Sequence, residues 1–228
     1  MHSPKGLIVT SPTQNAGKTV ISAGLAISML SSGLSAEAVK PLSYGTEDND
    51  IVYFAKITNR NVYYDCTLLD DWHMANTTHW NKLVHICKNF TYPVFLETPG
   101  CVSTPLKSDG EYYDCTDLAK TLDWPVLLTI NCAYKPYETA AQALLYLKQK
   151  DANVLGFMFT CSKNYSIEQI EEISGQLFIN TGYPCLGIIP YSPSISVEEL
   201  NKGNIIKLIQ EYVDLHPIQT ALDLLLLD

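Results

Sequence analysis

A glycine, a lysine and a threonine stand together near the start of the chain, between two apolar segments. Residues 7–10 form a short apolar run, and a polar turn leads from it to Gly17, Lys18 and Thr19, which open a longer apolar segment. A strand, a tight loop and a helix that begins at Gly-Lys-Thr are typical of a loop that binds phosphate groups. The start of a helix also favours an anion, because its backbone N–H groups are unpaired and its dipole is positive there. We therefore expect Lys18 to reach the outer phosphates of a nucleotide and the Thr19 hydroxyl to ligate its Mg²⁺.

The loop departs from the usual pattern at its entrance. The full motif is G-x-x-x-x-G-K-[ST], and Pro12 occupies the position of its first glycine. Because proline has a fixed φ and lacks an N–H group, the entrance must be built differently here. The alternative is a Gly-Lys-Thr that only begins a core helix, but the strand before it and the helix after it favour phosphate binding.

The remaining chemistry depends on residues that follow other predicted strands. Glu97 ends an apolar run, and Asp50 comes shortly after the second strand. Mg²⁺ prefers hydroxyl and carboxylate oxygens, so Thr19, Asp50 and Glu97 are candidate metal ligands. Lys40 ends the second strand, where its ammonium would balance the charge that develops during phosphoryl transfer. Taken alone, Asp50 has an alternative role as a helix cap, and Lys40 as a buried stem with a solvated head.

These residues need a scaffold that brings distant segments together, and the hydrophobic pattern predicts one. Short apolar runs alternate with helical patterns, without internal repeats. Strands are predicted at 7–10, 36–42, 93–98, 125–130, 154–159 and 185–189, and helices at 18–30, 50–58, 77–88, 114–122, 136–150, 166–179 and within 197–215. Residues 59–76 show no period and are predicted to be irregular.

This alternation is typical of an α/β fold. We expect a doubly wound, mainly parallel sheet of about seven strands with helices on both faces, formed by residues 1–228 as a single domain. In such a sheet ligands lie beyond the carboxyl ends of the strands. The candidate residues stand at those ends, so we expect them to converge.

The composition argues against two kinds of binding partner, nucleic acids and membranes. The chain has 24 acidic and 15 basic residues, a net charge of −9, and no basic cluster of the kind that binds nucleic acid. No apolar run approaches the ~18 residues that a membrane span needs, and residues 1–5 lack an apolar leader. We expect a cytoplasmic protein whose seven cysteines are reduced and buried.

Several short patterns stand in a fixed order along the chain. Lys18 and Thr19 end segment 10–19, Lys40 begins a K-P-x-x-x-G pattern, Asp50 follows, and Glu97 begins a pattern that ends in Pro-Leu at 105–106. In this order and spacing they resemble dethiobiotin synthetase, an ATP-dependent family whose loop ends in V-G-K-T and whose later segments read K-P-x-x-x-G and E-G-A-G-G-x-x-x-P-L. Residues 186–190 extend the resemblance over most of the chain.

The resemblance implies a fold, a reaction and a partner. It implies a P-loop NTPase-like fold that uses ATP and Mg²⁺, usually in a homodimer with the substrate at the subunit boundary. It also implies that a diamine, 7,8-diaminopelargonate, takes up CO₂ or bicarbonate as a carbamate. ATP then phosphorylates the carbamate, and the neighbouring amine closes a cyclic urea.

Carried over by position, the resemblance assigns roles to individual residues. The catalytic residues would be Lys18 and Lys40. The nucleotide would be bound by Asn15, Ala16, Gly17, Lys18, Thr19, Val20, Thr160 and Pro190. The substrate would be bound by Thr13, Gln14, Lys40, Tyr44 and Thr98, and the metal by Thr19, Asp50 and Glu97.

The segment 134–139 differs from the family, which has a Gly-rich helix start there that receives the carboxylate tail of the substrate. Glu138 would occupy the positive end of the helix dipole itself and repel a carboxylate. Two alternatives therefore stay open. One is a related ligase with another substrate, such as the amidating enzymes of cobalamin synthesis. The other is a regulatory module that binds a nucleotide without catalysis, which is supported by Pro12, Tyr44 and the pair Thr98-Pro99.

Overall fold

The computed structural model describes residues 5–45, 49–59, 66–161 and 165–224. Its strands are β1 (Gly6–Thr10), β2 (Glu37–Val39), β3 (Leu42–Tyr44), β4 (Thr67–Leu69), β5 (Val94–Glu97), β6 (Val126–Asn131), β7 (Val154–Thr160) and β8 (Cys185–Ile189). Its helices are α1 (Lys18–Ser31), α2 (Asn49–Thr58), α3 (Thr77–Lys88), α4 (Cys115–Leu122), α5 (Pro136–Gln149), α6 (Ile167–Thr181), α7 (Ile205–Tyr212) and α8 (Leu215–Ala221), with a 3₁₀ turn, η1, at Trp72–Met74. That residues 1–228 form one domain stays a prediction.

The main sheet has six strands in the order β2-β5-β1-β6-β7-β8, all parallel. The sequence places β2 directly after β1, yet β5 lies between them. This order means that the chain winds outward from β1 in both directions and leaves helices on both faces. The prediction of a doubly wound α/β fold with a mainly parallel sheet is confirmed, with six strands in this sheet rather than about seven.

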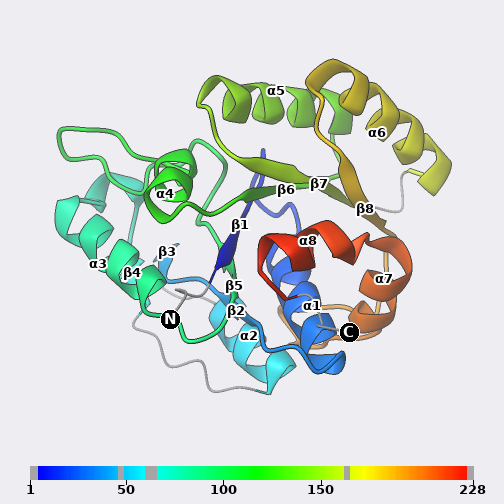
Figure 1. Ribbon diagram of the computed structural model, residues 1–228, viewed down its shortest axis with the longest axis horizontal. Helices are drawn as coiled ribbons and strands as arrows, with labels where there is room; N and C mark the ends of the chain where they lie inside the picture. Colours follow the sequence, from blue (N-terminus) through cyan, green and yellow to red (C-terminus); the bar gives the residue numbers. More distant parts are fainter. Residues whose placement is uncertain (1–4, 46–48, 60–65, 162–164, 225–228) are drawn as a thin grey trace.

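Side chains along the strands alternate between two hydrophobic cores. Ile8 and Leu96 pack with α3, α4, α5 and α6, whereas Leu7 and Phe95 pack with α1, α2, α7 and α8. Figure 1 shows α5 and α6 above the sheet and α1, α7 and α8 below it. Strands buried on both faces read as continuous apolar runs, which is why the central strands were recognisable in the sequence.

The prediction for residues 36–42 was wrong in one respect. A single strand was expected, but β2 ends at Val39, and after Lys40 and Pro41 a new strand, β3, begins at Leu42. β3 pairs in parallel with β4 in a separate two-stranded sheet. Part of the segment 59–76 is therefore a strand rather than irregular, and its residues 60–65 lie outside the described ranges.

The last predicted helix, within 197–215, begins late. Leu200 and Gly203 have φ values of 53° and 48°, in the left-handed region that a right-handed helix cannot include. α7 therefore starts at Ile205, and the separate α8 follows it.

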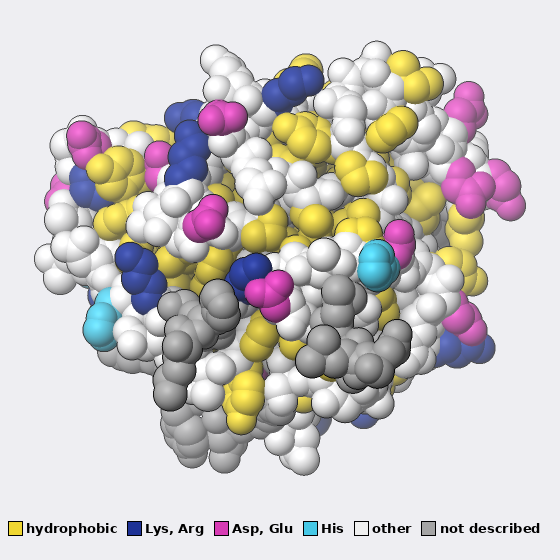
Figure 2. Space-filling view, in the orientation of Figure 1, with side chains coloured by type: hydrophobic (Ala, Val, Ile, Leu, Met, Phe, Trp, Pro, Cys, Tyr) yellow, Lys and Arg dark blue, Asp and Glu magenta, His cyan; other side chains and the backbone are white. Residues whose placement is uncertain are grey.

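The face drawn in Figure 2 carries acidic and basic side chains scattered among hydrophobic ones, with no basic patch. Among the described residues no helix has both the length and the apolar character needed to cross a membrane.

Candidate active site

The carboxyl ends of β1, β2 and β5 meet at one edge of the main sheet and border a cavity of about 570 Å³. Ten of the residues predicted from the sequence line it. They are Gln14, Asn15, Ala16, Gly17, Lys18, Thr19, Lys40, Tyr44, Asp50 and Glu97. Segments up to 83 positions apart in the sequence therefore contribute to one site, as expected for segments that follow neighbouring strand ends.

Residues at two neighbouring strand ends form hydrogen bonds with the backbone of the loop before α1. At the end of β6, Asn131 Nδ2 donates to the backbone oxygen of Asn15 over 3.0 Å. At the end of β7, Thr160 Oγ1 donates to the backbone oxygen of Ala16 over 3.0 Å. Asn15 itself has φ 55°, a conformation that asparagine tolerates better than most residues. These contacts fix the loop backbone whose N–H groups precede the helix.

Gly17, the N-cap of α1, is required by both its backbone and its surroundings. Its φ is 83°, and a Cβ atom there would lie 2.8 Å from Thr160 Cγ2. We expect Gly17→Ala to lower the free energy of unfolding by about 1–3 kcal/mol and to weaken nucleotide binding, because the loop must shift. Urea unfolding and calorimetric titration with ATP measure the two effects.

Gly33 provides the matched control for that variant. It follows the other end of α1 with φ 81°, but a Cβ atom there meets nothing within 4 Å. Gly33→Ala therefore carries only the backbone strain and should leave nucleotide binding unchanged. Equal effects of the two variants would contradict the role of the Thr160 contact.

Lys18 lies at the bottom of the loop with its side chain almost fully buried. Its Nζ donates to Ser11 Oγ over 3.2 Å and to the backbone oxygen of Gly100 over 2.8 Å. Burial lowers the pKa of this ammonium, and the nearby Glu97 carboxylate opposes that shift. The Ser11 hydroxyl in turn donates to the backbone oxygen of Thr13 over 2.6 Å. A serine thus organises the entrance of the loop next to Pro12.

Lys40 lies between two of the three candidate metal ligands, the carboxylates of Asp50 and Glu97. Its Nζ forms an ion pair with Asp50 Oδ2 and lies 3.7 Å from Glu97 Oε1. Thr19 Oγ1 donates to Asp50 Oδ1 over 2.9 Å. One ammonium, one hydroxyl and two carboxylates, from α1, α2 and the ends of β2 and β5, therefore form a single connected cluster.

Glu97 is the most deeply buried acid of this cluster, with 3% of its surface exposed. Its Oε2 is buried and has no hydrogen-bond partner within the described residues. Desolvation raises its pKa to about 7, opposed by Lys40 and reinforced by Asp50. An orphaned carboxylate oxygen beside a threonine hydroxyl and an aspartate is a set of hard oxygen donors, and this set fits Mg²⁺.

The raised pKa of Glu97 predicts a pH dependence of stability in the ligand-free protein. The ordinary pKa of 4.5 applies to the unfolded chain and about 7 to the folded one, so between these values only the folded protein keeps the proton. The free energy of unfolding should therefore fall as pH rises through this window, by up to about 3 kcal/mol. Glu97→Gln should flatten the slope and raise the melting temperature above pH 7.

Thermal unfolding between pH 4 and 8 tests this prediction. Glu172→Gln, at an exposed position on α6, serves as the control and should keep the slope of the natural protein. A Glu97→Gln protein with an unchanged slope would show that another group causes it.

Three cavity residues come from a segment that the sequence left unassigned. Asp70, Asp71 and Trp72 follow β4 and line the cavity together with Tyr44 of β3. Tyr44 Oη donates to the backbone oxygen of Pro105, and burial raises its pKa. The acids and aromatics of 59–76 were visible in the sequence, but no periodicity predicted the β3–β4 pairing that brings them to the site. The cavity lining also includes residues that were not among the predicted site residues, namely Ser43, Gly45, Pro99, Gly100 and Thr104.

Five predicted site residues lie outside the lining of this cavity. Thr98 is buried, and its hydroxyl donates to Thr10 Oγ1 over 3.0 Å. Thr13 lines a second cavity of about 300 Å³ beside α5. Thr160 lies behind the loop, as described, and Val20 and Pro190 stand on α1 and just after β8. Their roles in binding stay predictions.

The sequence matches known proteins over most of its length. The pattern of the AAA domain family designated AAA_26 matches residues 5–199. A hydrogenobyrinate a,c-diamide synthase of Brucella ovis is 24% identical over 201 residues, which cover 87% of this chain but only 43% of that enzyme. An ATP-dependent dethiobiotin synthetase of Thermodesulfovibrio yellowstonii is 22% identical over 227 residues, which cover 88% of this chain and 92% of that enzyme.

Among solved structures, the MinC:MinD cell division protein complex of Aquifex aeolicus has a similar chain. The TM-score is 0.56 at 17% identity, and the match covers 95% of this chain and 93% of the other. At this identity the likeness establishes the α/β fold alone.

Proposed function

Because the chain belongs to the AAA domain family AAA_26, which it matches over residues 5–199, we propose that it is an ATP- and Mg²⁺-dependent ligase. It would phosphorylate an acid oxygen of a small substrate and then join that group to a nitrogen. The observation that carries this proposal is the meeting of Lys18, Thr19, Lys40, Asp50 and Glu97 in one cavity. The two relatives, an ATP-dependent synthetase and a diamide synthase, support ATP use and amide formation.

The loop before α1 would bind the phosphates of ATP. Its backbone N–H groups and the positive end of the helix dipole suit an anion, and the Lys18 ammonium adds a full charge. Lys18 now donates to Ser11 and Gly100, and phosphate oxygens would replace these two acceptors. The ammonium would therefore stay hydrogen-bonded when the nucleotide binds. Mg²⁺, held by Thr19, Asp50 and Glu97, would polarise the phosphoryl oxygens when bound.

Lys40 would act on the group that is transferred. Asp50 and Glu97 hold its ammonium at the cavity wall, so the charge is already positioned before the reaction. Phosphoryl transfer asks the protein mainly for positioning and for positive charge where negative charge develops. No covalent nucleophile is required by this mechanism.

Within this class we favour a cyclic-urea-forming reaction of the dethiobiotin synthetase type. A diamine such as 7,8-diaminopelargonate would take up CO₂ as a carbamate, the carbamate oxygen would be phosphorylated, and the second amine would displace phosphate and close the ring. Asp70 and Asp71 line the same cavity, and their carboxylates suit the ammonium groups of a diamine. The expected homodimer with the substrate at the subunit boundary is part of this proposal.

A second candidate is amidation of a larger carboxylate substrate. One observation favours it, namely that Glu138 is exposed in the first turn of α5. A carboxylate there disfavours the binding of an acidic substrate tail to this helix start. A substrate without such a tail at that position avoids the repulsion.

Release of ADP from ATP separates these possibilities. The purified protein is incubated with Mg²⁺ and ATP, first with 7,8-diaminopelargonate and bicarbonate, then with hydrogenobyrinate and an ammonium salt. Substrate-dependent ADP release in the first mixture supports the cyclic urea reaction, and release only in the second supports amidation. Binding of ATP by calorimetry without release in either mixture would overturn both and leave a nucleotide-binding module.

A further inference from the structure

Two cysteine thiols lie next to each other at the ends of neighbouring strands. Cys132 Sγ donates to Cys161 Sγ over 3.7 Å. The residues just before them, Asn131 of β6 and Thr160 of β7, are register partners in the parallel sheet. Neighbouring strands lie about 4.8 Å apart, which is within the Cα–Cα range of a disulfide. Both cysteines also pack on the same hydrophobic core, so their side chains share one face of the sheet.

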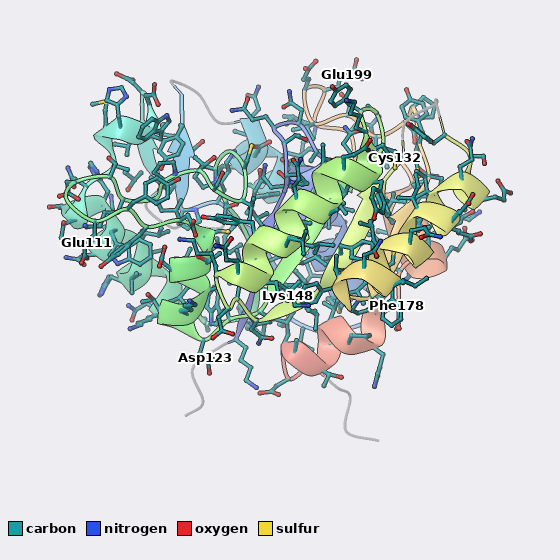
Figure 3. All side chains as sticks on the ribbon, turned by 90° about the horizontal axis from the view of Figure 1, so that it is seen from above. Glu111, Asp123, Cys132, Lys148, Phe178 and Glu199 are labelled. Atoms are coloured by element: carbon teal, nitrogen blue, oxygen red, sulfur yellow. The ribbon has the colours of Figure 1, made fainter. Side chains whose placement is uncertain are left out.

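The contact between these thiols differs from the other thiol hydrogen bonds of the described residues. Cys66, Cys115 and Cys185 donate to backbone oxygens, those of Thr67, Val102 and Gly187. Such thiols behave as small core residues with a weak donor. Cys132 and Cys161 instead present two sulfurs to each other, at the N-terminal end of α5 where Figure 3 labels Cys132.

We propose that Cys132 and Cys161 are an oxidative modification site, a dithiol that closes into a disulfide and loosens the nucleotide-binding loop. Cys161 is partly exposed and would meet the oxidant, whereas Cys132 is buried and would resolve the reaction. The hydrogen bond from Cys132 also lowers the pKa of the Cys161 thiol, and the thiolate is the form that reacts.

Hydrogen peroxide is an oxidant that balances the reaction. The Cys161 thiol loses its proton, and its thiolate attacks one peroxide oxygen. The O–O bond breaks to give a sulfenic acid at Cys161, and the leaving hydroxide takes up the released proton as water. The Cys132 sulfur then attacks the Cys161 sulfur, the S–O bond breaks, and the hydroxyl leaves with the thiol proton as water. Two thiols and one peroxide thus give one disulfide and two waters, with the two electrons passing from the sulfurs to oxygen.

The disulfide would act on the loop through the residues that precede the two cysteines. A disulfide bond is about 2.05 Å long, so the two sulfur atoms must come closer together than their present 3.7 Å. Asn131 and Thr160, one position away, are the residues that hold the backbone oxygens of Asn15 and Ala16. A shift of the two strand ends as the bond closes would disturb both contacts at once. This consequence rests on the proposed nucleotide site, whereas formation of the disulfide does not.

Peptide mapping after oxidation tests the site directly. The reduced protein is treated with hydrogen peroxide, remaining thiols are blocked, and the digest is examined by mass spectrometry for a Cys132–Cys161 crosslink. Affinity for MgATP is measured by calorimetry before oxidation, after it, and after reduction with dithiothreitol. We expect the crosslink together with at least a tenfold loss of affinity that dithiothreitol reverses.

Two variants make the result specific. Cys161→Ser should give no crosslink and keep its affinity after peroxide, whereas Cys185→Ser, a partly exposed thiol at the amino end of β8, should behave as the natural protein. Absence of the crosslink in the natural protein would overturn the site. An unchanged affinity in the crosslinked protein, or an equal loss in Cys161→Ser, would overturn its coupling to the loop. Failure of the reduced protein to bind MgATP would instead overturn the proposed function, and the crosslink alone would then decide whether the dithiol site exists.

Discussion

Lys18→Ala should weaken nucleotide binding at least about 100-fold, while the protein stays folded. Hydrogen bonds to a charged group contribute about 1.5–3 kcal/mol each, and about 2.7 kcal/mol corresponds to a 100-fold change in affinity. The loss of stability should be small, because Lys18 is only 7% exposed and the desolvation of its ammonium offsets its bonds to Ser11 and Gly100. Calorimetric titration with MgATP and thermal unfolding give the two quantities.

Lys107→Ala is the matched control for this variant. Lys107 is also almost fully buried, at 6% exposed, and its ammonium also donates to backbone oxygens, those of Asp109 and Glu111. It does not line the site cavity, so its removal should leave affinity for nucleotide unchanged, with a loss of stability as small as that expected for Lys18→Ala. Normal binding by Lys18→Ala would count heavily against the proposed phosphate site.

Lys40→Ala should retain ATP binding and lose turnover by about 100- to 1,000-fold. That range is typical when one group that stabilises developing charge is removed from an active site. The loss should appear in kcat for ADP release rather than in the dissociation constant of ATP, because Lys40 is placed to act on the transferred group.

The contact of Lys40 with Glu97 predicts a second effect of this variant, a change in the pH dependence of the activity. Without the ammonium, nothing at that position opposes the desolvation of Glu97, so its pKa should rise further. The activity that remains should therefore need a higher pH than that of the natural protein. Equal losses of binding and turnover would mean that Lys40 only binds the nucleotide, and a melting temperature close to that of the natural protein ensures that the variant is folded.

The main sheet was predictable because its strands are buried on both faces. β5 is a continuous apolar run between Pro93 and Glu97, and a run of this kind is recognisable without knowledge of its neighbours. β3 and β4 are three residues each, too short to display a period, and their pairing joins residues about 25 positions apart. The cavity wall that they carry, with Asp70 and Asp71, could not be read from local pattern.

The same distinction applies to the candidate site. Lys18, Thr19 and Gly17 belong to a local motif, and Glu97 could be placed from the rule that strand ends converge. The contact of Asn131 with Asn15 joins residues 116 positions apart. It could not be predicted without knowing which strands are neighbours in the sheet. Thr160, which the resemblance places among the nucleotide-binding residues, donates its hydroxyl to the backbone oxygen of Ala16 at the back of the loop. Its role in nucleotide binding stays a prediction.

The pairing of Lys40 with Asp50 and Glu97 also bears on how an anion approaches from a distance. Lys18 and Lys40 carry two positive charges, Asp50 and Glu97 two negative ones when ionised, and the whole chain carries −9. The long-range field around the cavity entrance is therefore set by the acidic surface and not by the lysines, whose attraction acts only at close range. Added salt should screen this repulsion, so that ATP associates faster as ionic strength rises, the opposite of what an exposed basic pocket would give.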